Sequence, residues 1–224
     1  MLRTGPSARS SSPPVDRNHR NDFYDSESDD PHHIRERFVD NHRIHFAVAM
    51  QEIHDGRKES CWSWFLIPTA PYIVDGVERG SHINRMFALR GDDAVDEYLT
   101  FHKKKQLQRP NEGMAVVNLR DNYVQLLKAI HLQLKNGTTL NELLGEMDAI
   151  KAMSSFQLFF QAGKRLGDTE LSAICASVLQ LCGHGQYQQD EQKPPPRSQE
   201  QERRLYNFFS GGMPKLRGTR GKKE

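Results

Sequence analysis

The residues best suited to chemistry lie in one short segment, residues 56–68, which holds both tryptophans of the chain. Arg57 and Lys58 come first, and Trp62 and Trp64 follow. Guanidinium and ammonium groups bind phosphate or carboxylate, and indole faces stack on planar groups. The segment therefore predicts a pocket for an anionic, nucleotide-like small molecule. Tryptophans can also anchor a hydrophobic core, because each buries a large apolar surface, and this alternative stays open.

A second polar group follows in residues 148–165, where hydrophobic spacing predicts a helix. Asp148, Lys151, Ser154 and Ser155 recur at helical spacing, and Lys151 shares one side of the helix with both serines. This side is either exposed to water or lines an internal cleft, where it would close the predicted pocket. A serine beside a lysine can act as a nucleophile, but this spacing arises by chance in many helices, so no catalytic residue is assigned.

Metal binding is not indicated by the histidines and cysteines. His42 and His45 lie on one helical face without the adjacent glutamate of a metalloprotease motif, which favours a solvated face. Cys61, Cys175 and Cys182 are odd in number and lack ligand spacing. We therefore expect no metal site and a reducing compartment, with Cys61 as a small buried apolar group.

Composition indicates one domain with a sizeable core. The chain has 224 residues, of which 36% are hydrophobic and 27% charged, and a net charge of +2 argues against a nucleic-acid coat. No apolar run reaches the roughly 20 residues that a membrane span needs. Acidic residues soon follow the basic start, which is unlike a mitochondrial presequence. We expect an intracellular protein, cytoplasmic or nuclear, without a membrane partner.

The hydrophobic pattern predicts a mainly α fold, a single multihelical globular domain with a short extended or aromatic segment and disordered tails. Its predicted parts are a disordered N-terminal tail (1–30), the helical domain (31–183), a Pro/Gln-rich linker (184–199), a closing helix (200–212) and a basic tail (213–224).

In the first half of the domain, Asp30 and the following proline predict a helix start, and this helix ends before Gly56. The tryptophan segment fits either a strand or a short helix capped by Ser60. Residues 72–80 resemble a loop, and residues 86–89 a strand or extended run. The next predicted helix is capped at its start, by Asp92.

In the second half, residues 116–134 form the clearest amphipathic helix, and Asn136 with the next glycine ends it. Thr139 and Glu142 match a capping box at the start of a short helix. Asp168 predicts the cap of the helix after residues 148–165.

Several of these motifs occur in the same order in an uncharacterised family. The motifs are Arg37-Phe38-Val39, Gly56-Arg57-Lys58, the run Ser60 to Pro68, Ala88-Leu89 before Ala94 to Leu99, the set Asp148, Lys151, Ser154 and Ser155, and Phe208-Phe209-Ser210-Gly211. Through them the chain resembles the family domain of unknown function 1810 over residues 34–212. The resemblance implies a single, mainly α-helical domain and no established activity.

The chain departs from the family pattern at three positions in the tryptophan segment. Cys61 stands where the family has histidine, Ser63 where it has methionine, and Thr69 where it has glutamine. If the histidine and glutamine serve chemistry in relatives, the resemblance implies that this chain has altered or lost it. Two functions therefore remain open from the sequence: a ligand-binding domain, either an enzyme or a degenerate relative of one, and an interaction module.

The interaction module would act through the tails. Residues 213–224 carry five cations opposed by Glu224 alone, and such tails bind nucleic acid weakly and without sequence preference. The sequence assigns no cofactor to either function.

Overall fold

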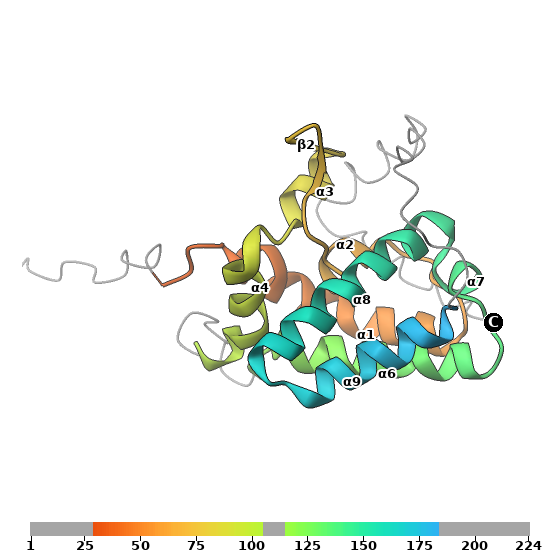
Figure 1. The fold of residues 1–224 in the computed structure, drawn as a ribbon. Coiled ribbons are helices and arrows are strands. Elements are labelled where there is room, and N and C mark those ends of the chain that lie inside the picture. Colours follow the sequence, from red (N-terminus) through yellow and green to blue (C-terminus); the bar gives the residue numbers. More distant parts are fainter. Residues whose placement is uncertain (1–28, 105–114, 184–224) are drawn as a thin grey trace, which may run out of the picture.

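The structure, a computed structural model, describes residues 29–104 and 115–183 (Figure 1). Within these ranges the elements are η1 (Arg35–Val39, a π-helical turn), α1 (Asp40–His54), α2 (Ser63–Leu66), β1 (Tyr72–Val74), β2 (Val77–Arg79), α3 (His82–Phe87), α4 (Gly91–Thr100), η2 (Phe101–Lys103, a 3₁₀ turn), α6 (Leu119–Lys135), α7 (Leu140–Leu144), α8 (Glu146–Leu166) and α9 (Thr169–Leu181). The prediction of a mainly α fold is confirmed.

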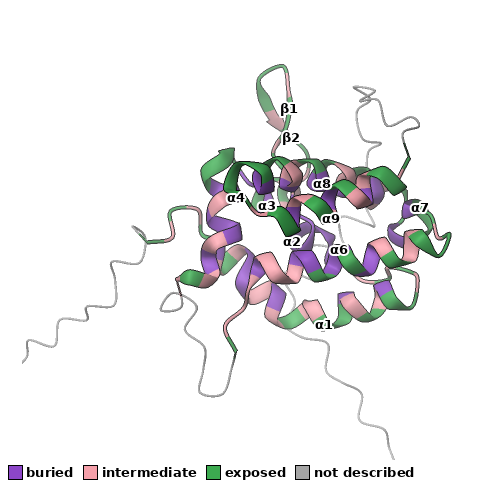
Figure 2. Ribbon diagram, turned by 60° about the horizontal axis from the view of Figure 1, so that its bottom comes forward, coloured by how far each residue is buried: buried purple, intermediate pink, exposed green. Residues whose placement is uncertain are grey.

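The core forms where five helices pack together. α8 lies along α9, α6 packs against both α9 and α1, and α4 contacts α6 and α8. In Figure 2 the buried residues lie on the sides of these helices that face one another. Gly163 allows α8 and α9 to approach closely, because a Cβ there would lie 3.0 Å from the backbone nitrogen of Ser172. The tryptophan segment, as α2, packs against η1, α1 and α3.

The N-terminal turn is held by two polar side chains. The Asp30 carboxylate accepts the backbone N–H groups of Ile34 and Arg35, but the cap position is Ile34, so the predicted cap at Asp30 is wrong. The Arg37 guanidinium donates to three backbone carbonyls, at His32, Met86 and Ala88. These bonds tie the start of the first helix to the segment around the end of α3.

Most helix limits follow the signals in the sequence. α1 ends at His54, before Gly56, as predicted. Thr139 and Glu142 form the predicted capping box of α7, and the Asp168 side chain accepts the N–H of Leu171 at the start of α9. α6 ends at Lys135, at the predicted stop.

The prediction of a loop over residues 72–80 is wrong, because β1 and β2 form an antiparallel hairpin there. Asp75 and Gly76 both have positive φ, +52° and +73°, as a two-residue turn of the primed type requires. An Asp-Gly pair flanked by apolar residues is the sequence signal for such a turn. The hairpin projects away from the packed helices (Figure 1).

Two further local predictions need correction. Met86 and Phe87 end helix α3, and Ala88 after them is extended. The Ser81 side chain caps this helix, a signal that the short apolar run concealed. Asp92 lies inside the first turn of α4 and does not cap it, because the preceding Arg90 occupies the cap position.

The tryptophan segment forms the short helix α2 and not a strand. Its cap position is Trp62 without a side-chain cap, so the predicted cap at Ser60 is wrong. The linker (184–199), the closing helix (200–212), the basic tail (213–224) and residues 1–28 of the N-terminal tail lie outside the described residues. The division of the chain into these parts stays a prediction.

Candidate functional site

The turn after α1 is organised by a carboxylate that the sequence did not single out. Glu52 accepts the backbone N–H groups of Glu59 and Ser60, and it accepts the indole N–H of Trp62 at 2.7 Å. Burial disfavours the ionised carboxyl, but the bonds from Ser60, Glu59 and Trp62 outweigh it and lower the pKa of Glu52. Glu52 therefore fixes both the turn and the first tryptophan. Nothing local in the sequence distinguishes it from other helical glutamates.

Lys58 connects this turn to α7 and α8. The Lys58 backbone N–H donates to the Leu143 carbonyl at the end of α7. The Lys58 ammonium lies 2.8 Å from an oxygen of Asp148, and the ammonium of Lys151 lies 3.7 Å from the other oxygen. Two cations thus share one carboxylate, and the trio carries a net charge of +1.

The second tryptophan supports one of these cations. The Lys151 ammonium lies 3.0 Å from the centroid of the Trp64 ring, and Lys58 lies 5.5 Å from the ring of Trp62. Attraction between an ammonium and an aromatic face is strongest when both are screened from water. We call the four residues Lys58, Asp148, Lys151 and Trp64 the lysine–tryptophan cluster.

The cluster lies almost entirely out of water. The side chains of Lys58, Asp148 and Lys151 are 11%, 16% and 20% exposed, and Trp64 is 5% exposed. Burial disfavours the ionised form of Asp148, but Lys151, Lys58 and the hydroxyl of Ser63 outweigh it, and the pKa of Asp148 falls below its ordinary value of 3.8. The carboxylate therefore stays charged.

The two serines of α8 have different surroundings. Ser155 is fully buried, donates to the Pro68 carbonyl at 2.7 Å and lies 2.9 Å from the hydroxyl of Tyr123. Ser154 is exposed, and its hydroxyl turns back to the Ile150 carbonyl of its own helix at 3.4 Å. The predicted polar side of this helix is therefore split between core and solvent.

The predicted site residues are thus only partly brought together. Lys58, Lys151 and Trp64 meet, joined by Asp148, and Ser155 lies one turn further along α8. Trp62 is buried against Glu52, whereas Arg57 and Ser154 are exposed. Whether any of them binds a ligand stays a prediction.

A buried histidine lies on the helical face that the sequence predicts to be solvated. His42 is 2% exposed, and its Nε2 lies 3.0 Å from the Phe65 carbonyl and 3.3 Å from the Tyr98 hydroxyl. Its Nδ1 lies 3.2 Å from the amide nitrogen of Asn122. The prediction of a solvated face is therefore wrong for His42, while His45 is half-buried.

The described ranges contain no group of three or more His, Cys, Asp or Glu side chains placed to hold a metal ion. Nor does any helix within them have the length and apolar character to cross a membrane. Cys61 is half-buried beside the tryptophans.

Comparison with known proteins identifies the family of this chain. The model of the family described as "Protein of unknown function (DUF1810)" matches residues 32–191. The chain belongs to the DUF1810 family. The resemblance expected from the motifs is confirmed, and both chain segments that build the lysine–tryptophan cluster fall within the family region.

Among solved structures, the chain is similar to the conserved hypothetical protein Rv1873 from Mycobacterium tuberculosis. The identity is 19% and the TM-score 0.48, over 65% of this chain and 87% of that one. A comparison with curated proteins finds no match.

Proposed function

We propose that this protein binds an anionic small molecule at the lysine–tryptophan cluster, with nucleotides as the first class to test. The observation that carries the proposal is the sharing of one carboxylate, Asp148, by two ammonium groups beside an indole face. The trio carries a net charge of +1, which favours the approach of a phosphate or carboxylate.

The energetic balance of the cluster supports a binding role. Removing charges from water is costly, and apolar residues of the same volume stabilise a fold as well or better. A charged trio that is mostly screened from solvent is therefore weak evidence for stability and favours a functional site. Lys58 and Lys151 keep small exposed fractions, and the exposed Arg57 is the sequence neighbour of Lys58.

The surroundings of Ser155 on α8 argue for a binding site and against nucleophilic attack by its hydroxyl. Ser155 donates its proton to the Pro68 carbonyl, which can only accept, and its oxygen is fully buried. A nucleophile needs a base within hydrogen-bond reach, and Ser155 has the Tyr123 hydroxyl there instead. We assign Ser155 the task of fixing the helix that carries Lys151.

The test is a thermal-shift screen of the full-length protein with nucleoside mono-, di- and triphosphates and with small dicarboxylates. A ligand at about 100 times its Kd adds roughly 2.7 kcal/mol to the free energy of unfolding, which raises Tm by several degrees. The variants Lys58→Gln and Lys151→Gln each remove one cation and should weaken binding of the hit at least tenfold. Lys128→Gln is the matched control, since that lysine is 56% exposed on α6.

Two outcomes would overturn the proposal. One is a screen in which no anion raises Tm. The other is a hit whose affinity, measured by calorimetry, is unchanged in both cluster variants, because that ligand would then bind elsewhere.

A further inference from the structure

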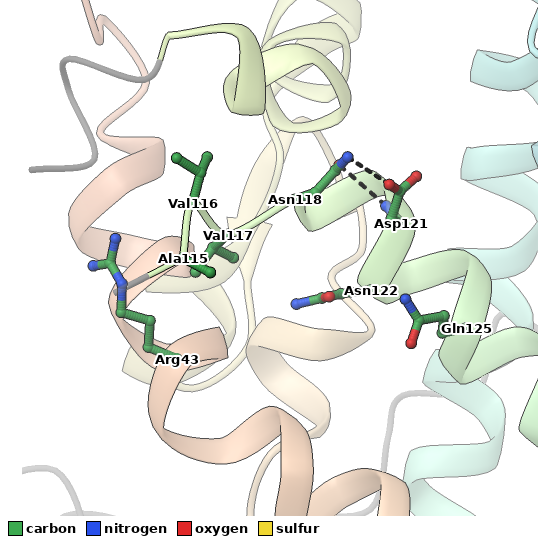
Figure 3. Close-up of a pocket in the computed structure, with 8 residues that line it drawn as sticks. All are labelled: Arg43, Ala115, Val116, Val117, Asn118, Asp121, Asn122 and Gln125. Carbon is green, nitrogen blue, oxygen red and sulfur yellow. Dashed lines mark hydrogen bonds between the residues drawn. The ribbon is translucent and has the colours of Figure 1, made fainter. Parts of the chain in front are cut away.

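A hollow lies between α1 and the start of α6, apart from the lysine–tryptophan cluster. Its volume is about 430 Å³, within the usual range for small-molecule sites. Figure 3 shows it with Arg43 on the side of α1 and the polar residues of α6 on the other side. Its lining residues are Arg43, Ala115, Val116, Val117, Asn118, Asp121, Asn122 and Gln125, and we call it the α1–α6 groove.

The two charges of the groove have opposite sign and stand on different elements. Arg43 belongs to α1 and lies 2.8 Å from Asp40, with 17% of its side chain exposed. Asp121 belongs to the first turn of α6, where Asn118 caps the helix and donates to its carboxylate at 2.6 Å. Asp121 remains 49% exposed although Arg120 also contacts it. A groove with a cation at one side and a carboxylate at the other matches a ligand that carries both charges.

Between the charges lies Asn122, whose orientation is set by the buried histidine. The Phe65 carbonyl can only accept, so the Nε2 of His42 carries the proton and Nδ1 is an acceptor. The Asn122 amide nitrogen must then donate to Nδ1, at 3.2 Å. This bond fixes which end of the Asn122 amide points to His42, and its carbonyl oxygen is left to accept from a ligand in the groove. Burial lowers the pKa of His42 to about 3, so the arrangement persists at neutral pH.

We propose that the α1–α6 groove binds a small zwitterion, of amino-acid or dipeptide size, with its carboxylate on Arg43 and its ammonium between the Asn122 carbonyl and Asp121. Gln125 offers both a donor and an acceptor to an amide of the ligand, and Val116 and Val117 supply an apolar wall. His42 is a positioning residue, because it acts through Asn122. This site is independent of the function proposed above.

The experiment is a titration of the full-length, ¹⁵N-labelled protein with free L-amino acids and glycine-containing dipeptides at millimolar concentrations. The side-chain amide signals of Asn122 and Gln125 report directly on the groove. We expect them to shift with at least one zwitterion, and we expect the N-acetylated or C-amidated form of that ligand to bind at least tenfold more weakly.

Variants then test each contact. Arg43→Gln and Asp121→Asn should each weaken binding at least tenfold, whereas Arg79→Gln, an exposed arginine on β2, should leave the Kd unchanged. The imidazole ¹⁵N shifts of His42 should show a neutral Nε2–H ring that does not titrate between pH 5 and 8.

Each part of the proposal has a result that would overturn it. No shift with any zwitterion overturns the site, and binding that survives either blocking group or either charge variant overturns the zwitterion assignment. A His42 ring that titrates in this pH range, or that carries its proton on Nδ1, overturns its positioning role. The NMR measurement of His42 needs no variant, so a folding defect cannot obscure it.

Discussion

The lysine–tryptophan cluster and the α1–α6 groove both combine cations with a carboxylate, but their contact with water differs. In the cluster Asp148 is 16% exposed and holds two ammonium groups, whereas in the groove Asp121 is 49% exposed. Removing one partner of an ion pair that is screened from water is costly, whereas removing one partner of an exposed pair costs little. We therefore expect substitutions in the cluster to change stability strongly, and substitutions of Asp121 and Gln125 in the groove to change binding while stability stays nearly constant.

The largest difference in the free energy of unfolding is expected between two matched substitutions, one in the cluster and one in the groove. Asp148→Asn leaves two lysines without their carboxylate and should reduce the free energy of unfolding by about 3 kcal/mol. Asp121→Asn removes an exposed pair with Arg120 and should cost less than about 1 kcal/mol. Urea denaturation of both variants at pH 7 measures the difference. Equal losses would contradict the comparison.

Stability at acidic pH should depend on His42, which contacts both α2 and the groove residue Asn122. Its pKa is lowered from 6.5 to about 3, so the unfolded chain binds the proton more readily and stability falls as pH drops below 6.5. The expected slope is about 1.4 kcal/mol per pH unit between pH 6 and 4. His42→Gln keeps a donor and an acceptor without a titrating ring, and it should flatten this slope. A wild-type protein with constant stability from pH 6 to 4 would refute the role of His42.

The adjacent serines of α8 offer a smaller contrast. Ser155→Ala leaves the buried Pro68 carbonyl and Tyr123 hydroxyl without their common partner, and it should cost about 1–2 kcal/mol. Ser154→Ala removes only a long bond to Ile150 on an exposed surface and should change stability by less than about 0.5 kcal/mol. Thermal unfolding of the two variants at equal concentration measures the contrast. A loss in Ser154→Ala as large as in Ser155→Ala would contradict the assignment of the effect to the buried hydrogen bonds.

The smallest effect on stability is expected at Gln125, which is exposed on α6. Gln125→Ala should change the free energy of unfolding by less than about 0.5 kcal/mol, because no packed contact is lost. The same variant should lower the affinity of a zwitterion bound in the groove. Paired urea denaturation and NMR titration check both expectations. A marked loss of stability would show that the groove is part of the core and not a separate open site.

The sequence predicted the fold correctly mainly where a local signal marks the start or end of a helix. Caps and stops act within one turn, so the caps at Thr139 and Asp168 were correctly predicted from residue type alone. The hairpin at Asp75 was also signalled locally, but its short strands fall below the length at which alternation is visible. The Asp-Gly pair therefore marks the turn, but the pattern of the flanking residues does not reveal the strands.

The candidate site depended on contacts between distant segments. Helical spacing correctly grouped Asp148 with Lys151, and residue type pointed to Lys58 and Trp64, but the ion pair that joins them spans ninety positions of chain. The burial of individual side chains could not be predicted from the sequence. Ser154 and Ser155 are sequence neighbours with opposite exposure, and His42 is buried because Phe65 and Tyr98 are brought to it by packing. Such partners have no local signature.

The bonds of Arg37 to three carbonyls limit how far the chain can be shortened from its N-terminus. A fragment that began at Phe38 would keep every large apolar residue of α1, but the Met86 carbonyl would lose its Arg37 donor and the Ala88 carbonyl would keep only a long bond, 3.4 Å, from Arg90. The segment between α3 and α4 would then be held less firmly, although it lies some fifty residues downstream of the cut. Expression and limited-proteolysis work should therefore retain Asp30 and everything after it.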